Sequence, residues 1–231
     1  GTTAMASTVL IAAGTTERLK IDSTGLYVNG SATALAGGGA SDIDGLTDGY
    51  NVGNSVGLGT GALANDDGTA NNNTAIGTNA LTANTTGTFN TSVGYYAHLN
   101  AVSGSNNVAI GGYAAFNLTT ANGTIAIGEM ALRYTTTGGS NIGIGTSAVE
   151  NATTNHSNIG LGNYSLRYVS SNSNIGIGHG AGDGITTGGN NTVIGDLAGT
   201  TTMADTVLIG AGSAERLKVD STGLYVNGSA T

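Results

Sequence analysis

Apolar side chains recur along most of this chain in short segments that each end in a glycine. Within a segment, an aliphatic residue or threonine, a small residue and a second aliphatic residue follow one another. Side chains of a β-strand point to opposite faces at every second position, so the pattern predicts short strands with one aliphatic face and one small-residue face. Ten such segments end at Gly59, Gly77, Gly94, Gly111, Gly128, Gly145, Gly162, Gly178, Gly195 and Gly210.

The spacing of these glycines, mostly 17 residues, is the signature of a solenoid. In a solenoid each rung buries its apolar surface only by stacking on its neighbours. We expect the aliphatic residues to form the core and the small-residue face to meet another surface. A small residue and an apolar residue after most of these glycines, as in Ala131-Leu132, predict a second strand per rung, and Thr, Asn, Ser and Gly complete the turns.

A longer repeat flanks this array. Residues 1–33 and 199–231 align at an offset of 198 and are identical at 27 of 33 positions. In each copy two alternating segments surround a Ser-Thr-Gly turn, which predicts a β-hairpin with a three-residue loop that covers the open edge of the solenoid. The chain therefore divides into a rung remnant and hairpin (1–36), a Gly-rich joint (37–50), the repeat array (51–212) and a C-terminal hairpin (213–231). A fibre built of 198-residue units would produce this order.

Composition narrows the functional classes. The chain has 41 Gly, no Pro, Cys or Trp, and only 9% charged residues. No apolar run approaches the roughly 20 residues of a membrane-spanning helix, and the absence of Cys excludes disulfides and thiolate metal sites. A net charge of −8 with six Lys and Arg argues against nucleic-acid binding. We expect no enzymatic activity, no cofactor and no resident metal.

One motif imitates a cofactor site. The pattern G-x-G-x-x-A occurs at 57–62, 143–148 and 176–181. A dinucleotide site needs one such turn between a strand and a helix, whereas here the pattern recurs and turn residues follow it. We assign it to the repeat.

Histidine and aspartate offer two further candidates. His98, His156 and His179 lie in different rungs without metal-ligand spacing. A partly buried or interface histidine is the simpler interpretation, and the alternative is that one histidine meets its copies around an ion on an oligomer axis. Asp66-Asp67 lies in a Gly/Asn loop that fits a solvated turn, with calcium binding as the alternative.

Tyrosines are the candidate surface-binding residues. Tyr95, Tyr96, Tyr113 and Tyr164 closely follow rung glycines, and Leu-Arg-Tyr recurs at 132–134 and 166–168. Exposed tyrosines could stack on sugars while asparagines supply hydrogen bonds. The alternative is packing between protomers, where Tyr contributes area and a polar handle. No pattern places a carboxylate pair for glycosidase chemistry.

Two family resemblances rest on these residues. The motif N-[ST]-x-[AG]-[IV]-G followed by x-x-A, over roughly 51–212, resembles the head repeat of trimeric autotransporter adhesins, although that repeat is shorter. This resemblance implies a left-handed parallel β-roll in a homotrimer. Residues 17–25 (ERLKIDSTG) and 41–48 (SDIDGLTD) resemble segments of bacteriophage tail fibre proteins.

Together the resemblances imply a structural shaft or head segment of an extracellular trimeric fibre. The tail-fibre resemblance favours a virion tail that serves host attachment, with copies of itself and neighbouring fibre segments as partners, and a host-surface glycan or protein as a further candidate. The alternative is an adhesin head on a bacterial cell surface that binds host matrix or glycans directly. A carbohydrate-degrading spike enzyme is a third reading.

Overall fold

A computed structural model describes the backbone of residues 9–13, 16–22, 25–28, 31–32, 49–52 and 229–230, and the backbone and side chains of 54–69 and 71–226. Every regular element in these ranges is a β-strand. The chain divides into two compact units, Gly1–Tyr50 and Asn51–Thr231. The all-β class predicted from the sequence is therefore confirmed.

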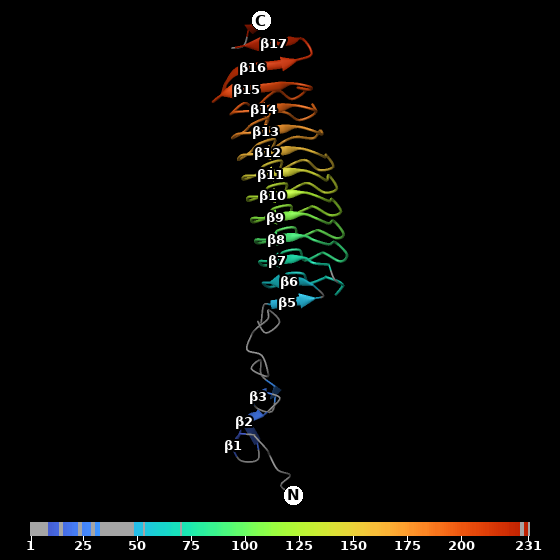
Figure 1. Ribbon diagram of the computed structural model, residues 1–231, viewed down its shortest axis with the longest axis vertical. Coiled ribbons are helices and arrows are strands. Elements are labelled where there is room, and N and C mark those ends of the chain that lie inside the picture. Colours follow the sequence, from blue (N-terminus) through green and yellow to red (C-terminus); the bar gives the residue numbers. More distant parts are fainter. Residues whose placement is uncertain are drawn as a thin grey trace. The chain divides into compact units, whose positions relative to one another are not determined.

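The second unit contains a parallel β-solenoid, in which the strands are stacked one above another (Figure 1). Ten strands of the described residues, β6 to β15, are joined by nine parallel pairings, so the chain makes about nine turns. Partnered residues such as Thr74 and Thr91 lie 17 positions apart in most pairings, which confirms the predicted period. The strands are β6 (Ser55–Leu58), β7 (Thr74–Ile76), β8 (Thr91–Val93), β9 (Val108–Ile110), β10 (Ile125–Ile127), β11 (Ile142–Ile144), β12 (Ile159–Leu161), β13 (Ile175–Ile177), β14 (Thr192–Ile194) and β15 (Val207–Ala211).

The two faces of these strands are reversed relative to the prediction. The middle residue of each strand points into the solenoid; it is small in most rungs and buried, as Ala75, Ala109 and Ala126 show with no exposed surface. The flanking aliphatic residues point outward. The reason is the thin cross-section: a Cβ added at Gly143 would lie only 2.8 Å from the carbonyl oxygen of Ala148 on the opposite wall. Small residues are needed inside because the two walls almost touch.

The opposite wall is not a second strand, so that prediction is wrong. After the rung glycines from Gly59 to Gly178 the described backbone runs through turns in which alternate residues have positive φ, for example Met130 at 59° and Leu132 at 54°. Leu132 still donates its N–H to the carbonyl of Ala148 in the next rung, at 3.0 Å. The wall is therefore a stack of turns joined by hydrogen bonds between rungs. Its leucines fill the interior.

The rung glycines are required by backbone geometry. Gly128 has φ of +130°, and a Cβ at this position would lie 2.6 Å from the carbonyl oxygen of Gly145 in the next rung. Residues other than glycine rarely adopt such a φ. The predicted role of the glycine at the corner is confirmed, and the close approach of the next rung adds a second reason for it.

A buried ladder of asparagines stiffens the corner before seven of the described strands, a role that the sequence pattern did not reveal. Asn107 accepts a hydrogen bond on Oδ1 from the N–H of Thr124 in the next rung, at 2.9 Å, and donates from Nδ2 to the carbonyl of Ala121, at 2.8 Å. Buried backbone groups must find partners, and one amide side chain here satisfies two of them. The same Oδ1 contact is made by Asn73, Asn90, Asn141, Asn158, Asn174 and Asn191.

Antiparallel strands flank the solenoid, which confirms the predicted hairpins. β15 is followed by β16 (Ala214–Asp220), β17 (Gly223–Val226) and β18 (Ser229–Ala230), each antiparallel to the one before. Asp220 pairs with Gly223, so the hairpin loop has two residues rather than the predicted three. β5 (Gly49–Val52) is the other end strand of this sheet.

The first unit holds a separate four-stranded antiparallel sheet. Its strands are β1 (Val9–Ala13), β2 (Thr16–Asp22), β3 (Gly25–Val28) and β4 (Ser31–Ala32), in that order. The predicted Gly-rich joint at 37–50 lies outside the described residues, except for its last two, which belong to β5.

Candidate functional site

The outward face of the parallel sheet carries an apolar surface, which we call the aliphatic stripe. It consists of the third strand residue of every rung, next to a column of Val, Ile and Thr at the first position. Ile76, Ile110, Ile144 and Ile177 each leave 37–40% of their surface exposed. Parallel register places them above one another, so the exposed patches join. The other third-position members are Leu58, Val93, Ile127, Leu161, Ile194 and Ile209.

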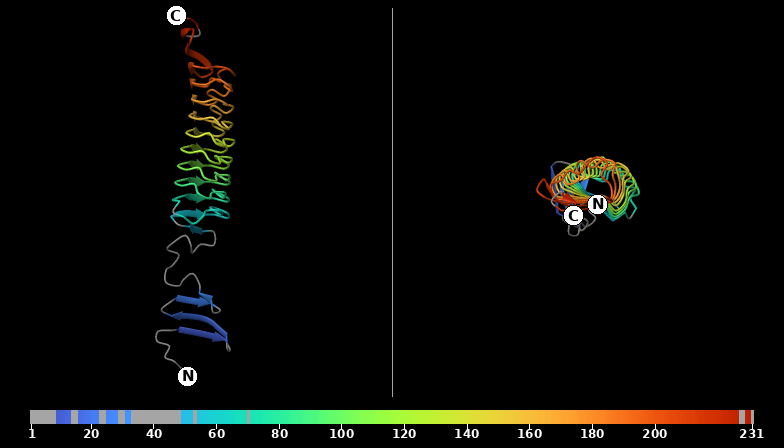
Figure 2. Two further views of the ribbon diagram at one scale, coloured as in Figure 1. Left: turned by 90° about the vertical axis from the view of Figure 1, so that its right-hand side faces the viewer. Right: turned by 90° about the horizontal axis from the view of Figure 1, so that it is seen from above.

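A continuous exposed apolar surface is unusual on a monomer. Parallel sheets normally have both faces covered, and contiguous exposed patches larger than a few hundred Å² mark interaction sites. The strands that carry the stripe are stacked along the solenoid (Figure 2). Sequence reasoning missed this site by assigning these residues to the core.

Three of the four predicted tyrosines lie together. The ring centroids of Tyr95 and Tyr96 are 4.1 Å apart, and that of Tyr113 lies 5.5 and 5.6 Å from them. Phe116 extends the group at 5.6 Å from Tyr113. Tyr95 is 49% exposed and the other two tyrosines are half-buried. A hydrogen bond with Tyr96, together with desolvation, raises the pKa of Tyr95 to about 12.

Tyr164 belongs to a second group, organised by Arg167. The Arg167 guanidinium lies 5.1 Å from the ring centroid of Tyr164 and 4.9 Å from that of Tyr168. Its Nε atom is 3.1 Å from Oε2 of the buried Glu150. Burial raises the pKa of the nearby Asp183 carboxyl, against the opposing charge of Arg167. The recurring Leu-Arg-Tyr motif was the signal for this group.

Arg133 repeats the same arrangement beside the first tyrosine group. Its guanidinium lies 5.3 Å from the ring centroid of Tyr113 and 5.0 Å from that of Tyr134. Such cation–π contacts hold long side chains in place. The tyrosines therefore form two stiffened aromatic groups whose outer members, Tyr95 and Tyr164, present ring surface to solvent.

The three histidines do not come together. His98 is fully buried inside the solenoid, where its Nδ1 lies 3.4 Å from Oγ of Ser92 and its Nε2 has no hydrogen-bond partner. Burial lowers its pKa to about 4. The prediction of a buried histidine is confirmed for His98, and its interior position prevents contact with copies in other chains. His156 accepts a hydrogen bond from the N–H of Gly139, and His179 lies 3.7 Å from Asp196.

The side chains of Asp66 and Asp67 accept hydrogen bonds from residues of their own loop. Oδ1 of Asp67 accepts hydrogen bonds from the N–H and Oγ1 of Thr69 and from Nδ2 of Asn71, at 2.7–3.1 Å. These bonds, the backbone one first, lower the pKa of Asp67. Oδ1 of Asp66 accepts from the N–H of Gly68 and from the same Asn71. The exposed Asp67 fits the solvated turn, whereas Asp66 is buried and its Oδ2 has no hydrogen-bond partner. Among the described residues no group of three or more His, Cys, Asp or Glu could hold a metal ion.

Comparison with protein-family models, curated proteins and solved structures gives no match to this chain. Within the part of the chain that the structure describes, no helix is long and apolar enough to cross a membrane.

Proposed function

We propose that this chain is a structural shaft or head segment of an extracellular homotrimeric fibre on a phage tail, where it serves host attachment. The observation that carries the proposal is the aliphatic stripe. Copies of the chain would bury their stripes against one another around a common axis, because an isologous or cyclic assembly is the usual way to cover a self-complementary apolar face. The trimer and the left-handed winding come from the resemblance to adhesin heads.

The interior of the solenoid supports a mechanical role. Nine turns spaced by about 4.8 Å make a rod section of roughly 43 Å, and its rungs are held by backbone pairing and by the asparagine ladder. Each rung contacts only its neighbours, so the section can lengthen by adding rungs without a change of design. A rod of this kind holds a binding tip away from the particle that carries it.

The first test is the solution mass measured by light scattering during size-exclusion chromatography. We expect a mass near three times the 22.5 kDa of the chain. The double variant Ile110→Lys/Ile144→Lys places charges on two exposed members of the stripe and should reduce the mass to that of one chain. Thr137→Lys, at an exposed loop position, is the matched control and should leave the assembly intact.

Two results would contradict this proposal. A wild-type chain that stays monomeric at high concentration would show that the stripe is not a self-interface. A double variant that keeps the wild-type mass would show that the chains meet through another face. Circular dichroism melting of each variant separates loss of assembly from loss of folding.

A second candidate, direct recognition of surface glycans by an adhesin head, is favoured by the exposed rings of Tyr95 and Tyr164. Sugars stack on aromatic faces, and the arginine contacts already fix the ring of Tyr164. Glycan-array binding by the assembled wild type that is lost in Tyr95→Ala/Tyr164→Ala would support this candidate. An array without bound glycans would leave the spacer role as the better account.

A further inference from the structure

The two terminal sheets have the same strand pattern. β1–β4 and β15–β18 have identical lengths, and each boundary is displaced by 198 residues. Their registers agree residue by residue: Val9 pairs with Ile21 as Val207 pairs with Val219, and both first pairings shift register after the third strand residue. The second and third pairings also coincide. The sequence repeat is therefore a repeated structural module.

The modules differ in what lies beside their first strand. In the C-terminal module, β15 pairs on its other edge with β14 in parallel, where Thr192, Val193 and Ile194 partner Val207, Leu208 and Ile209. In the N-terminal module, β1 is an edge strand, and within the described residues no strand pairs with its outer side. Unpaired edges offer a row of backbone donors and acceptors to another chain.

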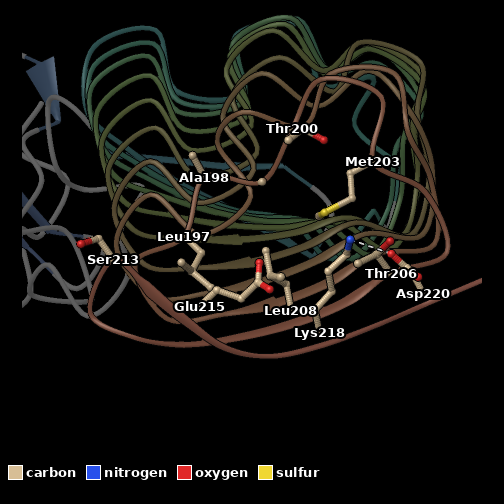
Figure 3. A pocket seen from close by; sticks show the side chains of 11 residues that line it. Leu197, Ala198, Thr200, Met203, Thr206, Leu208, Ser213, Glu215, Lys218 and Asp220 are labelled. Carbon is tan, nitrogen blue, oxygen red and sulfur yellow. Dashed lines mark ion pairs between the residues drawn. The ribbon is translucent and has the colours of Figure 1, made fainter. Parts of the chain in front are cut away.

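The C-terminal module also extends the sheet beyond the last rung of the solenoid. Leu197, Met203 and Leu208 of the last turns line a cavity of about 510 Å³ together with Glu215 and Lys218 of β16. Figure 3 shows the strand that carries Glu215 and Lys218 running across this end. Nζ of Lys218 lies 2.6 Å from Oδ2 of Asp220. The N-terminal sequence repeats these three residue types at Glu17, Lys20 and Asp22.

We propose that β1–β4 is a cap for a second solenoid, and that the free edge of β1 pairs in parallel with the last strand of a segment equivalent to residues 54–198. The occupant is thus a rung of the β14 type, which the C-terminal module already holds in the same register. Units of this kind would join end to end, each roll closed by the first strands of the next unit. The proposal holds whether or not the roll is trimeric.

Two of the six differences between the copies bear on the fit. Ser7 stands where the C-terminal copy has Asp205, whose Oδ1 accepts a hydrogen bond from Nδ2 of Asn190. Ala12 stands where the C-terminal module has Gly210. A Cβ at Gly210 would lie 2.6 Å from Cδ1 and 2.7 Å from Cγ of Leu197. The tip of Leu197 is flexible and adjoins the cavity, so it can turn aside to admit the methyl group. The N-terminal cap should therefore fit this roll, and should fit better when Leu197 is shortened.

The test is a tandem chain in which residues 1–198 are followed by a complete 1–231. Residues 1–33 of the second copy then replace 199–231 of the first. Thr192→Cys in the first copy and Val9→Cys in the second place one thiol on each predicted partner, because Thr192 partners Val207 in the single chain. Adjacent strands lie within the Cα range of disulfides, and the chain has no other cysteine.

We expect oxidation to link the two cysteines within one chain, as it should in a single-chain control with Thr192→Cys and Val207→Cys. Ala13→Cys in place of Val9→Cys moves the second thiol about 13 Å along the strand and should not cross-link. The molecular mass measured under denaturing conditions distinguishes disulfides within a chain from disulfides between chains. The variant Leu197→Ala in the first copy should raise the yield.

Three results would overturn the proposal. The first is no link in the tandem chain while the single-chain control is oxidised fully. The second is equal linking at positions 9 and 13, which would mean that the cap has no fixed register. The third is a first solenoid that melts well below the solenoid of the single chain, because an uncapped end would then explain its instability.

Discussion

Protonation of the buried His98 should make the solenoid less stable in mild acid. Its ring has no exposed surface, and its only near polar partner is Ser92, with Nε2 left unpaired. Burial lowers the pKa from 6.5 to about 4. The unfolded chain therefore binds the proton more readily than the folded chain. Above pH 6.5 this difference in proton binding does not lower the free energy of unfolding. The loss of stability grows as the pH falls toward 4.

The difference between these pKa values corresponds to about 3 kcal/mol of unfolding free energy. Leucine occupies the same position in the neighbouring rung, as Leu81, and is fully buried there. His98→Leu should therefore remove the pH-dependent cost and also the unpaired ring nitrogen, which is worth about 1–3 kcal/mol. We expect the variant to be more stable than the wild type already at pH 7.5.

The assay is guanidinium unfolding of both proteins at pH 7.5, 5.5 and 4.5, followed by circular dichroism. Titration of all other groups cancels in the difference between variant and wild type. That difference should widen by about 2–3 kcal/mol between pH 7.5 and pH 4.5. A difference that stays constant over this range would refute the reasoning, because it would mean that His98 titrates alike in the folded and unfolded chains.

Three further substitutions test the rung design, each by urea unfolding. Gly128→Ala should lower the free energy of unfolding by about 3 kcal/mol or more, because of backbone strain and overlap with the next rung. In the control Gly112→Ala nothing lies within 4 Å of the new methyl group, so the loss should be less than about 0.5 kcal/mol. Equal losses would contradict the argument from backbone geometry. Asn107→Ala should lower the free energy of unfolding by about 2–5 kcal/mol, because it leaves a buried backbone N–H and a buried carbonyl without hydrogen-bond partners. At the exposed Asn163, substitution by Ala should cost under about 1 kcal/mol. Thr124→Asn should stabilise by about 1 kcal/mol, since the Thr124 hydroxyl is buried without a partner where the two adjacent rungs carry Asn107 and Asn141. Destabilisation would show that the corner cannot hold the larger side chain.

The fold could be predicted because its determinants are local and repeated. A strand triplet and a glycine recur every 17 residues, and each rung repeats the same geometry. Even the glycine could be explained, because a fixed glycine before a turn implies a backbone conformation closed to other residues. Repetition turns a weak signal in one rung into a strong one over ten.

The orientation of the strands could not be predicted, for a physical reason. Both faces of a rung are free of charge, so alternation alone does not show which face is inside. The assumption that larger aliphatic residues form the core fails here because the walls of the solenoid lie too close together. Gly160 illustrates this: a Cβ there would lie 2.6 Å from Cγ2 of Val149. Wall separation is a tertiary quantity that no single rung encodes.

The asparagines and the tyrosines were only partly interpretable for a related reason. Asn, Thr and Gly are common in turns, so a buried Asn174 bonded to Asn191 in the next rung has the same sequence signature as an exposed turn residue. Tyr95, Tyr96 and Tyr113 stand out as rare aromatics, but their mutual contacts depend on the stacking of two rungs. Contacts between rungs can be identified only when the three-dimensional stacking of the rungs is known.

The structure separates what stabilises a rung from what remains free for assembly. Backbone pairing, the asparagine ladder and the leucines of the turn wall all act inside the solenoid, and none of them uses the aliphatic stripe. A charge placed on Ile144 should therefore cost the single chain little, because the side chain is already 39% exposed, whereas it would be costly in an assembly that buries the same side chain. The proposed contact between chains would explain why an apolar residue with so much exposed surface stands at this position in every rung.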